Sequence, residues 1–307
     1  MPDVLADFLA ILAAQPALFI GICVALGLMI GSFLNVVIHR VPIMMDNELR
    51  ADCAALSNEE RAGTQAPSQP KFNVITPRSA CPKCKAPITA LQNIPVVSWL
   101  VLRGKCANCQ TPISKRYPVV ELATGLLSGF VAWHFGFGML AMAALAFTWF
   151  LIALTMIDFD TQYLPDSLTY PLLWLGLLVS LWHPAWAAGA TPIGPRESIL
   201  GAAAGYLSLW SVYWVFKLLT GKEGMGYGDF KLFAALGAWL GWQMLLPIIV
   251  FASGVGALFG IVVMIRKRKG RDMQIAFGPF LAIAGWLVMI AGHDIVSRYL
   301  SLFARPG

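Results

Sequence analysis

Charged side chains are scarce in this chain of 307 residues, since Asp, Glu, Lys and Arg together make up only 12% of it. A soluble domain usually carries about 25% charged residues. Hydrophobic residues make up 58% of the chain, and its mean hydropathy is +0.70. This balance excludes an ordinary soluble globular protein and predicts a polytopic membrane protein.

Three further features are absent from the sequence. The N-terminal stretch MPDVLADFLAILAAQP lacks the basic residues with which a cleaved signal peptide begins, so we expect the first apolar run to remain in the protein. No internal repeat is apparent. The histidines do not cluster, which argues against a histidine metal site or a catalytic triad; they are His39, His134, His183 and His293.

Eight apolar segments approach the length of about 20 residues that a membrane-spanning helix needs. The sixth is short and merges with the seventh around Trp242–Pro247. We therefore predict an all-α polytopic membrane protein with about eight transmembrane helices. The segments are 17–38, 119–136, 139–157, 167–183, 198–216, 231–243, 245–265 and 275–292.

The distribution of basic residues predicts the orientation in the membrane. Residues 39–118 hold 11 of the 22 Lys and Arg residues, and loops rich in these residues stay in the cytoplasm. With eight crossings, 19 of the 22 face the cytoplasm and both termini lie outside. The run RKRKGR at 266–271 is then a topology anchor rather than a nucleic-acid site, and membrane lipid is the expected partner.

The same pattern divides the chain into three parts. We expect residues 1–38 to form an N-terminal segment with the first transmembrane helix, 39–118 a cytoplasmic loop, and 119–307 a membrane-embedded domain of about seven helices. Within the loop, 44–80 has little apolar periodicity and is predicted to be loosely ordered. Residues 81–109 are predicted to form a compact module.

Four of the six cysteines form two Cys-x2-Cys pairs, Cys81 with Cys84 and Cys106 with Cys109. Two such pairs supply the four thiolates of a tetrahedral zinc site. The reducing cytoplasm argues against two structural disulfides, and redox-active thiols are the weaker alternative. Because four thiolates leave no position for water, we predict a structural zinc ion that stabilises a module too small for its own core.

Two carboxylates lie at the edges of apolar segments, where an ionisable group needs a partner or a function. Asp158 ends the third apolar segment and Asp229 precedes the sixth. In the eight-span topology both lie at cytoplasmic helix ends, so they can face one cavity. Two carboxyl groups around one water molecule perform aspartic proteolysis, sharing one proton. Solvated helix ends and a proton-coupled transporter with a zinc-stabilised cytoplasmic cap are the alternatives.

Taken together, these residues resemble the type IV prepilin peptidase family, also called leader peptidase/N-methyltransferase, whose members are GxGD-type intramembrane aspartic proteases. The resemblance covers nearly the whole chain and implies that 119–307 is a membrane-embedded catalytic domain with Asp158 and Asp229 as its catalytic residues. Asp158 is identified by its position seven residues before the proline of the Leu-Pro-Asp element. The motifs are GSFLNVVIHRVP (31–42), the two cysteine pairs with the sequence that follows (81–125), IDFDTQYLPD (157–166) and GMGYGDFK (224–231).

The resemblance also implies the substrates and the reactions. These are removal, after a glycine, of the short basic leader of prepilins and type II secretion pseudopilins, and methylation of the new amino terminus with S-adenosylmethionine. It implies a bacterial inner membrane protein with its active site toward the cytoplasmic face. The chain has no glycine-rich strand-turn-helix of a soluble methyltransferase.

Two residues are weak candidates for binding the methyl donor. Glu121 stands at the start of the second apolar segment, and the favoured alternative for it is an ion pair with Arg116 or Lys115. Gly104 precedes the second cysteine pair, and its favoured alternative is a plain turn. Lys231, close to Asp229, is expected to anchor its helix at the membrane interface rather than to tune the two acids.

Overall fold

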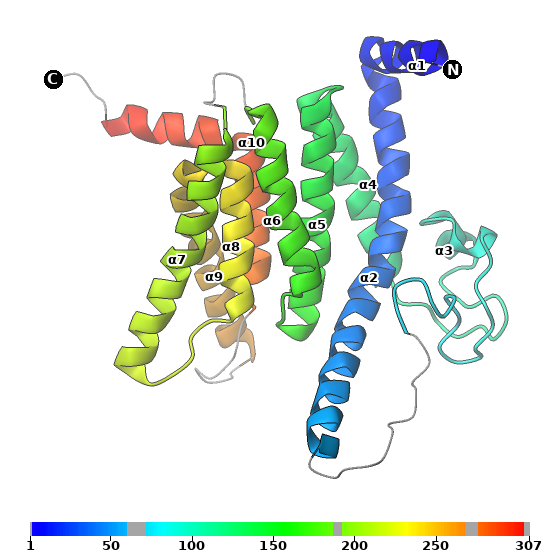
Figure 1. Cartoon of the computed structure of the whole chain (residues 1–307). Coiled ribbons are helices and arrows are strands. Elements are labelled where there is room, and N and C mark those ends of the chain that lie inside the picture. The colour runs from blue at the N-terminus through cyan, green and yellow to red at the C-terminus, as the bar shows by residue number, and fades with distance from the viewer. Residues whose placement is uncertain (1, 60–71, 187–191, 268–275, 304–307) are drawn as a thin grey trace. The chain divides into compact units, whose positions relative to one another are not determined.

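The computed structural model of the chain describes residues 2–59, 72–186, 192–267 and 276–303. These residues are mostly helical, and the chain divides into two compact units, Met1–Phe137 and Gly138–Gly307 (Figure 1). The first unit contains α1 (Pro2–Ala14), α2 (Pro16–Glu59), η1 (Leu91–Asn93), α3 (Val97–Val101) and α4 (Arg116–Phe135). The second contains α5 (Met139–Thr161), α6 (Asp166–Val179), η2 (Ser180–Trp182), α7 (Pro195–Thr220), α8 (Tyr227–Leu240), η3 (Trp242–Met244), α9 (Leu245–Lys267) and α10 (Gly278–Phe303).

Each of the eight predicted apolar segments overlaps one of the helices α2 and α4–α10. Among the described residues, five helical stretches are both long and apolar enough to cross a membrane. The helices α6 and α8 and the apolar part of α10, Gly278–Gly292, are shorter. The five spans are Pro16–Leu56, Arg116–Phe135, Met139–Thr161, Pro195–Thr220 and Trp242–Arg266.

The first long helix extends well beyond the apolar segment that predicts it. The sequence predicts a loosely ordered region from residue 44, but α2 continues to Glu59, so this prediction is wrong for 44–59. The reason is that this stretch is rich in helix-forming Met, Glu, Leu, Arg and Ala, and Arg50 pairs with Asp46 one turn earlier at 2.7 Å. Residues 60–71, also predicted to be loose, lie outside the described residues.

In the first unit, α2 and α4 pack closely through small residues. Gly27 and Gly31 on α2 face Gly125 and neighbouring residues of α4. A Cβ atom on Gly31 would lie 2.7 Å from the Cα atom of Glu121, and one on Gly125 would lie 2.9 Å from the Leu28 side chain. Glycines four residues apart on both helices allow this close backbone approach, as is common between membrane helices.

In the second unit, α8 is the central helix and is buried on nearly all sides. It packs against α6, α7 and α10. A Cβ atom on Gly201 of α7 would collide with the carbonyl oxygen of Gly237 on α8. Gly241, whose φ angle is 78°, ends α8 and η3 follows it, so the sixth and seventh predicted segments are separate helices.

The helices of the second unit run alternately in opposite directions, which places particular helix ends together. In Figure 1 the last turn of α5 and the first turn of α8 both lie at the lower end of this unit. Asp158 lies in that last turn and Asp229 in that first turn. The alternation therefore brings two acids that are far apart in sequence to one end of the unit.

Candidate active site and metal site

Asp158 and Asp229 are both buried, with 4% and 7% of their surface exposed. The α5 helix closes immediately after Asp158, because Gln162 adopts a left-handed conformation and its amide donates to the Asp158 carbonyl oxygen at 2.8 Å. The α8 helix opens around Asp229, whose amide donates to the Gly226 carbonyl oxygen at 3.2 Å. Each carboxyl group is thus fixed at a helix end rather than within a loop.

Leu164 connects the surroundings of the two acids. A Cβ atom on Gly228, the neighbour of Asp229, would lie 2.7 Å from Cβ of Leu164. A Cβ atom on Gly278 would lie 3.0 Å from Cδ1 of Leu164 and 2.5 Å from Oδ2 of Asp158. The carboxyl groups are also close enough for the charge of Asp158 to act on Asp229. The structure therefore brings together the two acids that the sequence singles out.

The neighbouring acids have different surroundings. Asp160 is exposed. Asp166 is the first residue of α6, as expected for a first-turn acid, and it accepts hydrogen bonds from Nζ of Lys231 at 2.6 and 2.8 Å. Lys231 also lies over the Tyr170 ring, with Nζ 5.2 Å from its centroid. This ion pair joins α6 to α8 two residues beyond Asp229, a pairing that the sequence analysis missed.

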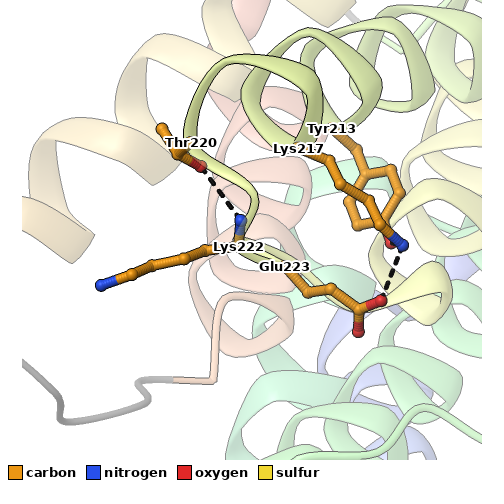
Figure 2. Close-up of polar contacts among 5 residues, drawn as sticks. All are labelled: Tyr213, Lys217, Thr220, Lys222 and Glu223. Atoms are coloured by element: carbon orange, nitrogen blue, oxygen red, sulfur yellow. Dashed lines mark hydrogen bonds and ion pairs between the residues drawn. The ribbon is translucent and has the colours of Figure 1, made fainter.

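Hydrogen bonds and an ion pair hold the loop before Asp229 against the end of α7 (Figure 2). Nζ of Lys217 donates to Oε1 of Glu223 at 2.8 Å and to the Tyr213 hydroxyl at 3.2 Å, and the amide of Lys222 donates to the Thr220 hydroxyl at 3.3 Å. The hydrogen bond from Lys217 holds the pKa of Glu223 below its usual value. These contacts limit the positions open to the glycine-rich segment that leads into α8.

Each Cys-x2-Cys pair forms a tight turn, which we call a knuckle, and the two knuckles have the same backbone structure. In each, the amide of the first cysteine donates to a carbonyl five residues later, Cys81 to Ala86 and Cys106 to Thr111, both at 2.9 Å. An isolated bridge closes each knuckle, Ala80 with Pro87 and Lys105 with Pro112. The repeat is visible in the sequence as R-x-x-C-x-x-C-x-x-P-I at 78–88 and 103–113. The expectation of no internal repeat is therefore wrong.

The two knuckles bring their sulfur atoms into one cluster. The Sγ atoms of all four cysteines lie within 4.8 Å of one another, with Cys81–Cys109 at 3.7 Å and Cys84–Cys106 at 4.0 Å. A tetrahedral ion with bonds of about 2.3 Å needs sulfurs about 3.8 Å apart, whereas a disulfide needs about 2.05 Å. Hydrogen bonding with the side chain and backbone of Thr111 lowers the pKa of Cys109 to about 6. The cluster fits a metal ion and not a pair of disulfides.

Comparison with known protein families matches most of the chain. Residues 25–135 match the bacterial peptidase A24 N-terminal domain, and residues 145–261 match the type IV leader peptidase family. A prepilin leader peptidase/N-methyltransferase of Stutzerimonas stutzeri is 51% identical over 297 residues, which cover 96% of this chain and 98% of the relative. The chain belongs to the type IV leader peptidase family.

Other members of the family show similar agreement. The prepilin leader peptidase/N-methyltransferase of Pseudomonas aeruginosa is 50% identical over 94% of this chain and 96% of its own length. That of Neisseria gonorrhoeae is 50% identical over 88% of this chain and 90% of its own length. No solved structure gives a significant match. The boundary between the two family matches falls close to the division between the two structural units.

The two weak candidates for methyl-donor binding have structural partners in this member of the family. Glu121 is buried on α4, and its Oε2 accepts a hydrogen bond from the amide of Val96 at 2.7 Å. Val96 has a φ angle of 60°, which is unusual for a β-branched residue. Gly104 also has a positive φ angle, and a Cβ atom on it would lie 2.8 Å from the Trp99 ring. Both residues hold the segment between the knuckles in place.

A buried arginine fixes the chain before the first knuckle, a contact that the sequence analysis also missed. Arg40 on α2 donates to the carbonyl oxygens of Asn73 at 2.9 Å and Pro77 at 2.6 Å. Nearby, Asn35 donates to the Tyr117 carbonyl oxygen at 3.1 Å. The Arg40 bonds attach the chain before the first knuckle to α2, and the Asn35 bond joins α2 to the start of α4.

Proposed function

We propose that the chain is a prepilin leader peptidase and N-methyltransferase in which Asp158 and Asp229 form the catalytic pair. One observation supports this most strongly: two buried acids from distant parts of the sequence lie together in a chain that belongs to the type IV leader peptidase family. The named relatives, about half identical over nearly the full length, support the activity.

The proposed chemistry is hydrolysis by a carboxyl pair. One carboxylate accepts a proton from water as the water oxygen adds to the scissile carbonyl carbon, and the other, protonated, donates a proton to the carbonyl oxygen. The first acid then gives its proton to the leaving amine as the C–N bond breaks, and the second regains one as the new carboxyl group forms. Burial strengthens the interactions between the reacting groups because bulk water is excluded around them. Asp166 is an unsuitable member of the pair, since both of its oxygens already bind Lys231.

The substrates that fit are prepilins and type II secretion pseudopilins cut after glycine. The glycine-rich segment 224–228 before Asp229 carries few side chains, so an extended peptide can approach it closely. We place the protein in the bacterial inner membrane with about eight crossings and with this pair toward the cytoplasmic face. An apolar pilin helix in the membrane then presents its basic leader to the same side.

The second proposed reaction transfers a methyl group from S-adenosylmethionine to the new amino terminus. We also propose that the four cysteines hold a structural zinc ion, because their spacing fits tetrahedral thiolate coordination. A zinc ion bound by four thiolates has no free position, so it would stabilise the knuckles and take no part in hydrolysis. The transporter alternative has no support, since both buried acids lie at one end of the helices of their unit.

The test is cleavage of a purified prepilin in the presence of a labelled methyl donor. Asp158→Asn and Asp229→Asn should each reduce cleavage at least about 1,000-fold, because each removes a proton-transfer group. Label should enter only the pilin that has been cleaved. Mass analysis of the product should show one added methyl group.

The matched control is Asp160→Asn, which changes an exposed acid two residues from Asp158 and should retain most of the activity. Circular dichroism of each purified variant checks that its helices remain. Normal cleavage by either Asp158→Asn or Asp229→Asn would disprove the catalytic pair.

A further inference from the structure

The N-terminal turn of α10 contacts Asp158 through a glycine. Gly278 is the first residue of this helix and is buried. The amides of Phe280 and Leu281 donate to the carbonyl oxygen of Phe277 at 3.0 and 3.2 Å, which makes Phe277 the N-cap of α10. The helix therefore begins directly beside the carboxyl group of Asp158.

The first amide of α10 has no partner within the helix. Pro279 has no N–H group, and the amide of Phe280 is bound to Phe277. The amide of Gly278 has no place in the helical ladder, and the backbone of Gly278 lies beside the Asp158 carboxyl. An N-terminal helix turn attracts negative charge through its amides and its dipole.

The carboxyl group in turn depends on this contact. Oδ2 of Asp158 is buried and makes no hydrogen bond of ordinary geometry with any described residue. Burying a carboxyl oxygen without a hydrogen-bond partner costs free energy. With no such bond to hold it, the position of Oδ2 is set by the atoms packed around it. One side of those surroundings is the backbone of Gly278.

There is no room for a side chain between the two groups. A Cβ atom on Gly278 would lie 2.5 Å from Oδ2 and 3.2 Å from Cγ of Asp158, and 3.0 Å from Cδ1 of Leu164. Contacts this short force something to move. Leu164 already packs against Gly228 beside Asp229, so it has little freedom to withdraw.

We propose that Gly278 is a positioning residue of the peptidase: its lack of a side chain lets the first turn of α10 pack against Asp158 and hold that carboxyl toward Asp229. This inference rests on the proposed function, in which Asp158 is catalytic. In this role Gly278 takes no direct part in the chemistry. It acts only through Asp158.

The first test measures the kinetics of Gly278→Ala with a purified prepilin. The added methyl group displaces the carboxyl, so kcat should fall about 10- to 100-fold, whereas KM should stay within about twofold because the peptide-binding surface is unchanged. The matched control is Gly254→Ala on α9, where an added Cβ meets nothing within 4 Å. Its kcat should equal that of the parent. An unchanged kcat in Gly278→Ala would overturn the proposal.

The second test measures the contact itself, without reference to activity. The thermal midpoint in detergent is compared for Gly278→Ala, Asp158→Ala and the double variant. If the methyl group collides with the carboxyl, Gly278→Ala should lower the midpoint in the parent by at least twice as much as in the Asp158→Ala background. An equal loss in both backgrounds would overturn the proposal.

Two outcomes need separate interpretation. If Gly278→Ala fails to fold, recovery of folded protein in the double variant supports the contact, and failure to recover it counts against the proposal. If Asp158→Asn cleaves prepilin normally, the proposed function fails. The comparison of thermal midpoints still decides whether Gly278 and Asp158 are in contact.

Discussion

The cysteine cluster and the aspartate pair are assembled in opposite ways. The four cysteines lie within a stretch of 81–109, in two knuckles with the same hydrogen bonds. The two acids stand on α5 and α8, and Leu164, in the loop between α5 and α6, and Gly278, at the start of α10, contribute to their surroundings. The first site is local in sequence, and the second exists only when the whole helical unit is packed.

Because of this difference, the two sites should be sensitive to different kinds of change. Among the described residues 78–113, only Cys81 and Gly104 are buried, so the geometry of the knuckles should depend on a bound metal ion and on backbone hydrogen bonds. The acids depend on helix packing, in which glycines and buried side chains set distances over the whole unit. A change at one site should therefore leave the other largely intact.

The strongest test of this independence is loss of the metal. Cys81→Ser should abolish zinc binding, because it removes one of the four ligands of a site that contributes about 10–16 kcal/mol to folding of similar modules. Elemental analysis measures the bound zinc, and limited proteolysis should then cut the region 72–115 much faster.

The matched control for this test is Cys53→Ser, which changes an exposed cysteine on α2 that is not part of the cluster. It should retain zinc and resist proteolysis like the parent. Equal zinc content in Cys81→Ser and in the parent would show that the cluster is not the metal site. Faster proteolysis of the second unit would show that the two regions are not independent.

An intermediate effect is expected from the ion pair that joins α6 to α8. Asp166→Asn or Lys231→Gln should each destabilise the protein by about 1–2 kcal/mol, because each leaves a partly buried charge without its partner. Cleavage should fall with stability, since the pair lies two residues from Asp229. Thermal midpoints in detergent and kcat/KM measure the two effects.

A charge reversal separates pairing from other effects of these substitutions. The double variant Asp166→Lys with Lys231→Asp should recover at least half of the stability lost by the worse single variant. No recovery would indicate that the two residues act independently.

The smallest effect is expected from the exposed ion pair between Lys217 and Glu223. Glu223→Gln should change kcat/KM by less than about twofold, because exposed pairs contribute little. The pKa of Glu223 is lowered by Lys217, so the contact is present at neutral pH and is lost as the pH falls through that lowered pKa. High salt should remove the small difference between parent and variant. A large, salt-resistant loss of activity would show that the Lys217–Glu223 pair contributes more to activity than is expected of an exposed ion pair.

Several features could be predicted from the sequence because they have local patterns. Apolar length located the helices, and the spacing of the cysteine pairs indicated four ligands that the structure does bring together. The repeat of the two knuckles was also visible in the sequence, but its small size beside the apolar segments concealed it. The importance of Asp158 and Asp229 rested on motif spacing rather than on any pattern of burial.

Other features could not be predicted because they depend on pairing between distant residues. A single sequence does not show that Lys231 binds Asp166 or that Gly278 packs against Asp158, since each of these residues could equally well face solvent. The extension of α2 beyond residue 43 was missed for a different reason. Polar composition indicates exposure to water, and an exposed segment can be helical when its residues favour a helix.

The continuous course of α2 has a mechanical consequence. Its 44 residues, with Pro42 inside the helix, span at most about 66 Å, roughly twice the thickness of the hydrocarbon layer. Because Arg40 binds the chain just before the first knuckle, a tilt or rotation of this helix imposed by the surrounding lipid should be passed on to the knuckles. We expect bilayer thickness to influence the height and direction at which the cysteine cluster stands relative to the membrane surface.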